Sequence, residues 1–116
     1  MKWLTLERIK HQLRIEQDFH EEDEWLEDAG ETAEDAILEA LNRSYEDMYE
    51  VYGRVPAPVR HASLMLVTSL YKDREKDLVQ EVNANPTFSF LLKPYMRLAS
   101  PYTNGQNQNQ YGCKNL

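Results

Sequence analysis

Apolar residues recur at intervals of three and four along much of the chain, which is the spacing of one face of an α-helix. A first helix is predicted over residues 6–13, and the Thr5 hydroxyl can cap it by accepting a hydrogen bond from an amide of the first turn. A second helix is predicted to begin near Asp18, with Glu21 three residues later as in a capping box. Small residues on its apolar side, including Gly30, favour a close helix partner. The apolar positions of this second helix are Trp25, Leu26, Ala29, Ala33, Ile37, Ala40 and Leu41.

Two further helices are predicted on either side of the stretch "VPAP". A short helix follows Ser44, a capping residue, and ends before Gly53, which suits the position just after a helix. The prolines then favour an extended link, and Pro58 suits the first turn of the next helix. That next helix is apolar on every side, so we expect it to be buried on several sides and to lie at the centre of the core. Its apolar residues are Val59, Ala62, Leu64, Met65, Leu66, Val67, Leu70 and Tyr71.

The remainder of the chain predicts a loop, a last short helix and a polar tail. The stretch "QEVNANP" is interpreted as the loop. The helix is predicted to start near Pro86 and to end or kink at Pro94, with Phe88, Leu91 and Leu92 covering the core. From Ser100 the chain is rich in Asn, Gln and Gly, and such a segment buries too little surface to offset its ordering entropy.

No run of alternating apolar and polar residues predicts a sheet. The prediction is therefore an all-α protein, a small bundle of about four to five helices around one central buried helix. We expect residues 1–99 to form the helical domain and residues 100–116 to be a flexible, disordered polar tail.

Length and composition are those of one ordinary globular domain. The 116 residues are 41% hydrophobic and 28% charged. The longest apolar run, residues 62–71, is shorter than the roughly 20 residues that a membrane span needs. The start "MKWLTLERIK" lacks the pattern of a signal peptide, so we expect a cytoplasmic protein without a membrane partner. The one cysteine, Cys113, cannot form an internal disulfide.

The charge is distributed unevenly along the chain. Residues 1–50 carry 16 acidic and 5 basic residues, a net charge of −11, whereas residues 51–116 carry 4 acidic and 8 basic residues, a net charge of +4. An acidic surface repels the phosphates of DNA. The asymmetry is compatible with solvated helix faces, and also with subunits that dock an acidic face against a basic face.

Candidate chemistry is sparse. The acidic run "HEEDEWLED" could in principle hold Mg²⁺ or perform acid–base work, but these acids crowd a predicted helix start, where the helix dipole favours them. None of the three histidines lies four residues from another, as a metal-binding pair on a helix would. They are His11, His20 and His61. We therefore predict no enzyme activity and no catalytic, cofactor or metal site. A DNA-reading helix stays open as an alternative, although acids offset the bases of its one candidate, "YKDREKDLVQE".

Five marks in order resemble the head–tail connector (adaptor or head-completion) family of tailed bacteriophages. The family patterns are a start like "TLEEIKEHLRID", an acidic "EDD", an "NR" after the long helix, "VPAPLKQAVLLLVAHLYENRE" and a terminal "LLAPYR". Counterparts here are residues Thr5–Ile15, Glu22–Glu24, Asn42–Arg43, Val55–Glu75 and Leu91–Arg97. The polar tail after residue 100 is not part of the resemblance.

The resemblance implies an all-helical virion subunit without a cofactor. Such subunits form a homo-oligomeric ring of about a dozen copies, and the free protein can stay monomeric until a portal templates the ring. The ring lies between the portal protein of the filled head and the tail or a stopper protein, and DNA passes through its lumen without sequence-specific binding. Assembly takes place in the host cytoplasm, and the mature location is the head–tail junction of the virion.

The alternative function is that of a small helical DNA-binding or DNA-packaging regulatory protein. For the connector, the charge asymmetry suggests ring contacts between acids of the second helix and bases elsewhere. The candidate interface residues are Glu24, Glu27, Glu31, Arg54, Arg60, Arg74 and Arg97.

Overall fold

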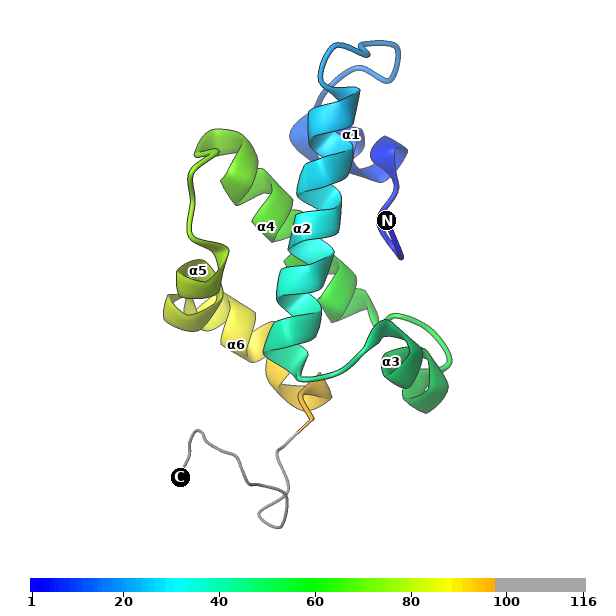
Figure 1. The fold of residues 1–116 in the computed structure, drawn as a ribbon, viewed down its shortest axis with the longest axis vertical. Helices are drawn as coiled ribbons and strands as arrows, with labels where there is room; N and C mark the ends of the chain where they lie inside the picture. The colour runs from blue at the N-terminus through cyan, green and yellow to red at the C-terminus, as the bar shows by residue number, and fades with distance from the viewer. Residues whose placement is uncertain (98–116) are drawn as a thin grey trace.

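The computed structural model describes residues 1–97, which form six α-helices, one short 3₁₀ helix and no strand (Figure 1). The predicted all-α bundle is confirmed. The predicted domain end at residue 99 and the predicted disorder of residues 100–116 lie outside the described residues. In chain order the elements are α1 (Leu6–Leu13), α2 (Asp23–Leu41), α3 (Tyr45–Tyr52), α4 (Ala57–Lys72), α5 (Leu78–Ala84), α6 (Pro86–Leu92) and η1 (Lys93–Tyr95).

The α4 helix is the centre of the bundle, as its all-round apolar pattern predicts. It packs along α2, and α1 and α6 also contact it, while α5 packs against α2 and α6 (Figure 1). Val59, Ala62 and Leu66 are fully buried. Burying one such aliphatic side chain contributes about 1.5–3 kcal/mol, so α4 supplies much of the stability of the core. No helix within residues 1–97 is long and apolar enough to cross a membrane.

Local signals position most helix ends. The Thr5 hydroxyl accepts a hydrogen bond from the Arg8 amide, and the Ser44 hydroxyl accepts one from the Asp47 amide, which confirms both predicted N-caps. After α3 the backbone enters the left-handed region at Gly53, where φ is 72° and glycine is favoured. These caps satisfy amides and carbonyls that a helix leaves without internal partners.

Two boundary predictions are wrong. The α2 helix begins at Asp23 rather than near Asp18, and Glu22, its N-cap, makes no side-chain capping bond. The stretch "QEVNANP" is not a loop, because most of it belongs to α5. Asp77 caps this short helix by accepting a hydrogen bond from the Gln80 amide, and Leu78 and Val82 anchor it in the core.

The C-terminal end of the described chain closes the core as predicted. Phe88 and Leu92 of α6 are buried and Leu91 is partly buried. Pro94 lies in η1, directly after α6, which is consistent with its predicted role in ending the helix.

The α3 helix sits at the periphery of the bundle (Figure 1). Met48 is its one buried residue. Aromatic contacts attach its two ends. The Tyr45 ring stacks on the Trp3 ring with 6.2 Å between the ring centroids, and the Tyr52 and Tyr95 rings form a T-shaped contact with 5.3 Å between their centroids.

The N-terminal segment approaches α2 closely at Gly30. A Cβ atom at this position would collide with the Met1 sulfur and would lie 2.9 Å from Cδ1 of Ile9. Such distances are shorter than van der Waals contact, so the glycine allows residue 1 and α1 to lie directly on α2. The close packing predicted at Gly30 is confirmed.

Candidate assembly surfaces

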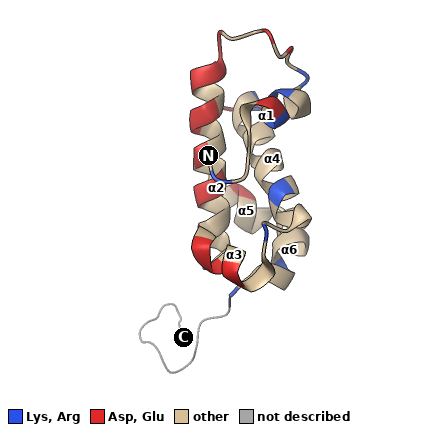
Figure 2. Ribbon diagram, turned by 90° about the vertical axis from the view of Figure 1, so that its right-hand side faces the viewer, with Lys and Arg blue, Asp and Glu red and all other residues tan. Residues whose placement is uncertain are grey.

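The outer side of α2 is a continuous acidic surface. The helix contains eight acidic residues and no basic one. Six of its carboxylates are exposed and project from one side, which we call the acidic face; Figure 2 shows the acids of α2 along one edge of the molecule. The acidic face consists of Glu24, Glu27, Asp28, Glu31, Asp35 and Glu39.

Partners within the chain reach only part of the acidic face. The N-terminal ammonium lies 3.7 Å from Glu31, and the Lys2 ammonium lies 3.8 Å from Asp35. Within residues 1–97 the other four carboxylates form no ion pair, and Glu24 and Glu27 are among them. The face is therefore strongly negative when the subunit is isolated.

Glu34 is the one acid of α2 that is fully buried, and it holds the N-terminal segment in place. Its Oε2 atom accepts hydrogen bonds from the amides of Trp3 at 2.7 Å and Leu4 at 2.8 Å, and the Lys2 amide donates to both carboxylate oxygens at 2.8 and 2.9 Å. The Trp3 indole then donates to the Ser63 hydroxyl on α4 at 3.0 Å. One carboxylate thus joins the segment before α1 to the α2–α4 pair.

Lys10 fastens the loop between α1 and α2. Its side chain is almost fully buried, and its ammonium donates to the carbonyls of Gln17 at 3.1 Å and Phe19 at 2.7 Å. The same ammonium lies 2.8 Å from Oδ1 of Asp23, while the His20 ring lies 2.8 Å from Oδ2. The Lys10 ammonium and the His20 ring hold the pKa of the Asp23 carboxyl below its ordinary value.

Arg74 joins the end of α4 to the start of α2. It pairs with Oε1 of Glu22 at 2.6 Å, and the Tyr71 hydroxyl donates to Oε2 at 2.7 Å. The guanidinium also lies 4.1 Å from the centre of the Trp25 ring, a cation–π contact. The hydrogen bonds from Tyr71 and then Arg74 lower the pKa of Glu22, and the bond to Glu22 raises the pKa of Tyr71. Arg74, a predicted interface residue, is therefore engaged within its own chain.

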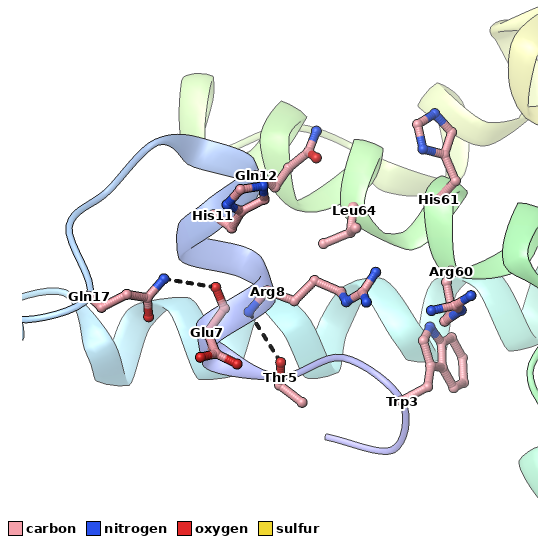
Figure 3. Close-up of a pocket in the computed structure, with 10 residues that line it drawn as sticks. All are labelled: Trp3, Thr5, Glu7, Arg8, His11, Gln12, Gln17, Arg60, His61 and Leu64. Atoms are coloured by element: carbon pink, nitrogen blue, oxygen red, sulfur yellow. Dashed lines mark hydrogen bonds between the residues drawn. The ribbon is translucent and has the colours of Figure 1, made fainter.

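A hollow of about 860 Å³ lies between α1 with its preceding segment and α4, and we call it the α1–α4 groove (Figure 3). Arg8 reaches from α1 across the groove toward α4, and Arg60 of α4 lies beside the Trp3 ring. Within residues 1–97 neither guanidinium has a hydrogen-bond or ion-pair partner. The residues that line the groove are Trp3, Thr5, Glu7, Arg8, His11, Gln12, Gln17, Arg60, His61 and Leu64.

The predicted interface acids lie together, whereas the predicted interface bases do not. Glu24, Glu27 and Glu31 share the acidic face, as their helical spacing requires. Among the bases, only Arg60 lines the α1–α4 groove. Arg54 is exposed in the link before α4. Arg97 follows η1, where its amide donates to the Leu41 carbonyl at 2.8 Å.

Arg8 is the groove residue that sequence reasoning missed. Its position in α1, off the apolar stripe, marks it only as a surface residue. Arg8 and Arg60 line the same groove only because α1 packs against α4, so no local sequence signal identifies Arg8 as a groove residue.

The candidate chemical residues form no assembled centre in the described chain. No group of three or more His, Cys, Asp or Glu side chains within residues 1–97 could hold a metal ion. In the acidic run, Glu22 and Asp23 make the ion pairs with Arg74 and Lys10 described above. His11 and His61 line the α1–α4 groove, and Cys113 lies outside the described residues.

A small all-α protein with a rigid centre and oppositely charged outer surfaces is well suited to association with other subunits. The chain matches the family model described as "Phage gp6-like head-tail connector protein" over residues 4–103. This match covers most of the chain, and the protein therefore belongs to that family of phage structural proteins. The predicted family and the coarse functional class are confirmed. Neither the search of curated proteins nor the search of solved structures found a match.

Proposed function

We propose that copies of this chain form a ring at the head–tail junction of a phage or prophage virion. The ring, of about a dozen copies, attaches to the portal of the DNA-filled head and receives the tail or a stopper protein. DNA passes through its lumen, assembly takes place in the host cytoplasm, and the subunit performs no chemistry and needs no cofactor. The family match over residues 4–103 is the observation that carries this proposal.

The fixed shape of the subunit supports a role in a ring. A closed ring requires that each subunit present two different surfaces at a constant angle. In this chain Glu34 fixes the N-terminal segment, Lys10 fixes the α1–α2 loop, and Arg74 fixes the end of α4 against α2. These contacts hold the segments around α2 in one arrangement, which favours a constant angle between neighbours.

The distribution of charge supports contacts between unlike surfaces. The acidic face lies on α2, along one edge of the molecule, while the basic residues of α1 and α4 lie toward the opposite edge (Figure 2). Head-to-tail contacts between such surfaces generate rings when the rotation between neighbours closes. Exposed acids also repel phosphate, so DNA that passes the subunit would not adhere to this face.

Disruption of the gene in the phage tests the placement at the junction. Without a connector, infected or induced cells should accumulate DNA-filled heads and free tails, and supply of the intact gene in trans should restore tailed, infectious particles. Electron microscopy and plaque counts measure both outcomes. Tailed particles of normal infectivity from the disrupted phage would refute the proposal.

Reconstitution tests the ring itself. Purified protein is examined by electron microscopy alone and with the portal protein of the same phage, and rings are expected in the mixture. Because salt screens contacts between exposed charges, ring formation should weaken between low and high ionic strength. If no ring forms and no complex with the portal is found at any ionic strength, the assembly role is wrong.

The alternative, a DNA-binding or packaging regulator, is distinguished by two simple observations. The gene of a connector should lie between head and tail genes, close to those of the portal and capsid, whereas the gene of a regulator need not. A chain with a net charge of −7 should not shift duplex DNA at physiological salt in a mobility assay. A sub-micromolar, salt-sensitive shift would favour the regulator.

A further inference from the structure

We infer that the α1–α4 groove of one subunit receives the acidic face of α2 from the next copy, and that Arg8 and Arg60 bind Glu24 and Glu27 there. This inference rests on the proposed function, because it assumes that copies of the chain associate. The proposed function requires a contact between neighbouring copies, and this inference assigns that contact to the α1–α4 groove and the acidic face.

The groove carries two cationic groups that have no counterion within residues 1–97. Arg8 comes from α1 and Arg60 from α4, and Figure 3 shows the Arg8 side chain extending toward the part of α4 that carries Arg60. Two like charges in one hollow repel each other, and an anionic group placed between them removes that cost. The Glu7 carboxylate, the one acid in the lining, points away from both guanidinium groups (Figure 3).

The walls of the groove suit a protein surface. Trp3 lies beside Arg60, and Leu64 lies above the Arg8 side chain (Figure 3). Arginine and tryptophan are the residue types that most often dominate binding energy at protein interfaces, because each combines a large apolar area with a directed polar group. An incoming helix can therefore exchange water for both apolar contact and ion pairs.

The acidic face carries the matching groups. Glu24 and Glu27 are one helical turn apart on α2, so both carboxylates point the same way with an axial offset of about 4.5 Å. Carboxylates pair with guanidinium groups through two parallel hydrogen bonds, which fixes orientation as well as charge. Within residues 1–97 neither Glu24 nor Glu27 has an ion-pair partner.

The two surfaces lie on opposite sides of the subunit, so one chain cannot bring them together. The acids of α2 lie along one edge in Figure 2 and the bases of α1 and α4 toward the other. Each copy can therefore offer its acidic face to one neighbour and its groove to the other. DNA phosphate is the competing occupant, and we favour the second copy because this acidic chain repels DNA and carries the matching carboxylates.

Charge reversal with complementation tests the contact. One variant carries Arg8→Glu and Arg60→Glu, a second carries Glu24→Lys and Glu27→Lys, and a third combines all four changes. Ring formation is measured by native mass spectrometry and electron microscopy in the presence of purified portal. Each two-residue variant should form at least tenfold fewer rings than the unaltered protein, while the four-residue variant and an equimolar mixture of the first two should recover most of the rings.

A matched control reverses two bases outside the groove. Lys72→Glu with Lys93→Glu changes the net charge by the same amount as the groove variant, and both residues are exposed and lie outside the groove. This control should assemble like the unaltered protein. Circular dichroism melts confirm that every variant is folded before assembly is compared.

The outcomes separate this inference from the proposed function. If the unaltered protein forms rings and both reversal variants do so equally well, the contact is wrong while the proposed function stands. Defective variants that neither the mixture nor the four-residue variant rescues also refute the pairing. If the groove variant assembles normally but loses a measurable affinity of the unaltered protein for duplex DNA, the groove binds phosphate. If the unaltered protein never associates, both proposals fail.

Discussion

Replacement of Glu34 by alanine should release the N-terminal segment from α2. The Glu34 carboxylate is fully buried and is the acceptor for the amides of Lys2, Trp3 and Leu4. A hydrogen bond to a charged group contributes about 1.5–3 kcal/mol, so three such bonds set an upper limit of roughly 5–9 kcal/mol. The alanine variant also removes the cost of keeping a carboxylate away from water.

The net loss should be smaller than that upper limit, because the released amides can bind water. Detachment exposes Leu4, which is 3% exposed, and the partly buried Trp3. Loss of the leucine burial alone costs about 1.5–3 kcal/mol. We therefore expect Glu34→Ala to lower the free energy of unfolding by about 2–4 kcal/mol.

Urea titration followed by circular dichroism measures this change, and hydrogen exchange of the amides of residues 2–4 shows whether the segment has detached. Glu34→Gln keeps one carbonyl oxygen as an acceptor and should lose about half as much. Asp35→Ala is the matched control, because its pair with Lys2 joins side chains that are 73% and 44% exposed. Exposed pairs contribute about 0–1 kcal/mol. If Glu34→Ala costs no more than Asp35→Ala, the carboxylate does not anchor the segment.

Two further predictions concern the core and the α1–α2 loop. Leu66 is fully buried in α4, so Leu66→Ala should lower the free energy of unfolding by about 2–5 kcal/mol in urea titration, and a loss below about 1 kcal/mol would show that α4 is not central. Because Lys10 and His20 lower the pKa of folded Asp23, its ion pairs stabilise the protein above the ordinary aspartate pKa, and that stability is lost as pH falls through the folded pKa. Asp23→Asn should therefore lower the melting temperature at pH 7, and the melting temperature of this variant should fall less between pH 7 and pH 2 than that of the unaltered protein. If the melting temperatures of the two proteins change in parallel with pH, the contacts of Asp23 with Lys10 and His20 do not stabilise the fold.

Elements with local signals could be predicted from the sequence. Thr5 and Ser44 cap their helices, Gly53 follows α3, and α4 lies at the centre because its apolar residues surround the helix. In each case the determining atoms belong to residues a few positions apart. The cap of α5 has the same kind of signal, since Asp77 precedes Gln80 by three residues, but the polar stretch that follows it favoured a loop.

Features that depend on distant residues could not be placed in this way. The predicted start of α2 near Asp18 is wrong because Glu22 and Asp23 are oriented by Arg74 and Lys10 rather than by capping. The burial of Glu34 has a signal in the sequence, because this residue falls within the apolar stripe of α2, four residues after Gly30 and three before Ile37. For the candidate contact, helical spacing predicted that the acids share one face, whereas the groove exists only after α1 packs on α4.

The weak attachment of α3 means that this helix should separate from the bundle at a lower force than the α2–α4 pair does. One buried methionine, Met48, ring contacts at either end and the ion pair of Asp47 with Arg43 hold this helix, whereas α2 and α4 share a long buried seam. An element with few buried groups opens at a lower free energy than the core does. We therefore expect a force applied by a neighbouring molecule to displace α3 before it separates α2 from α4.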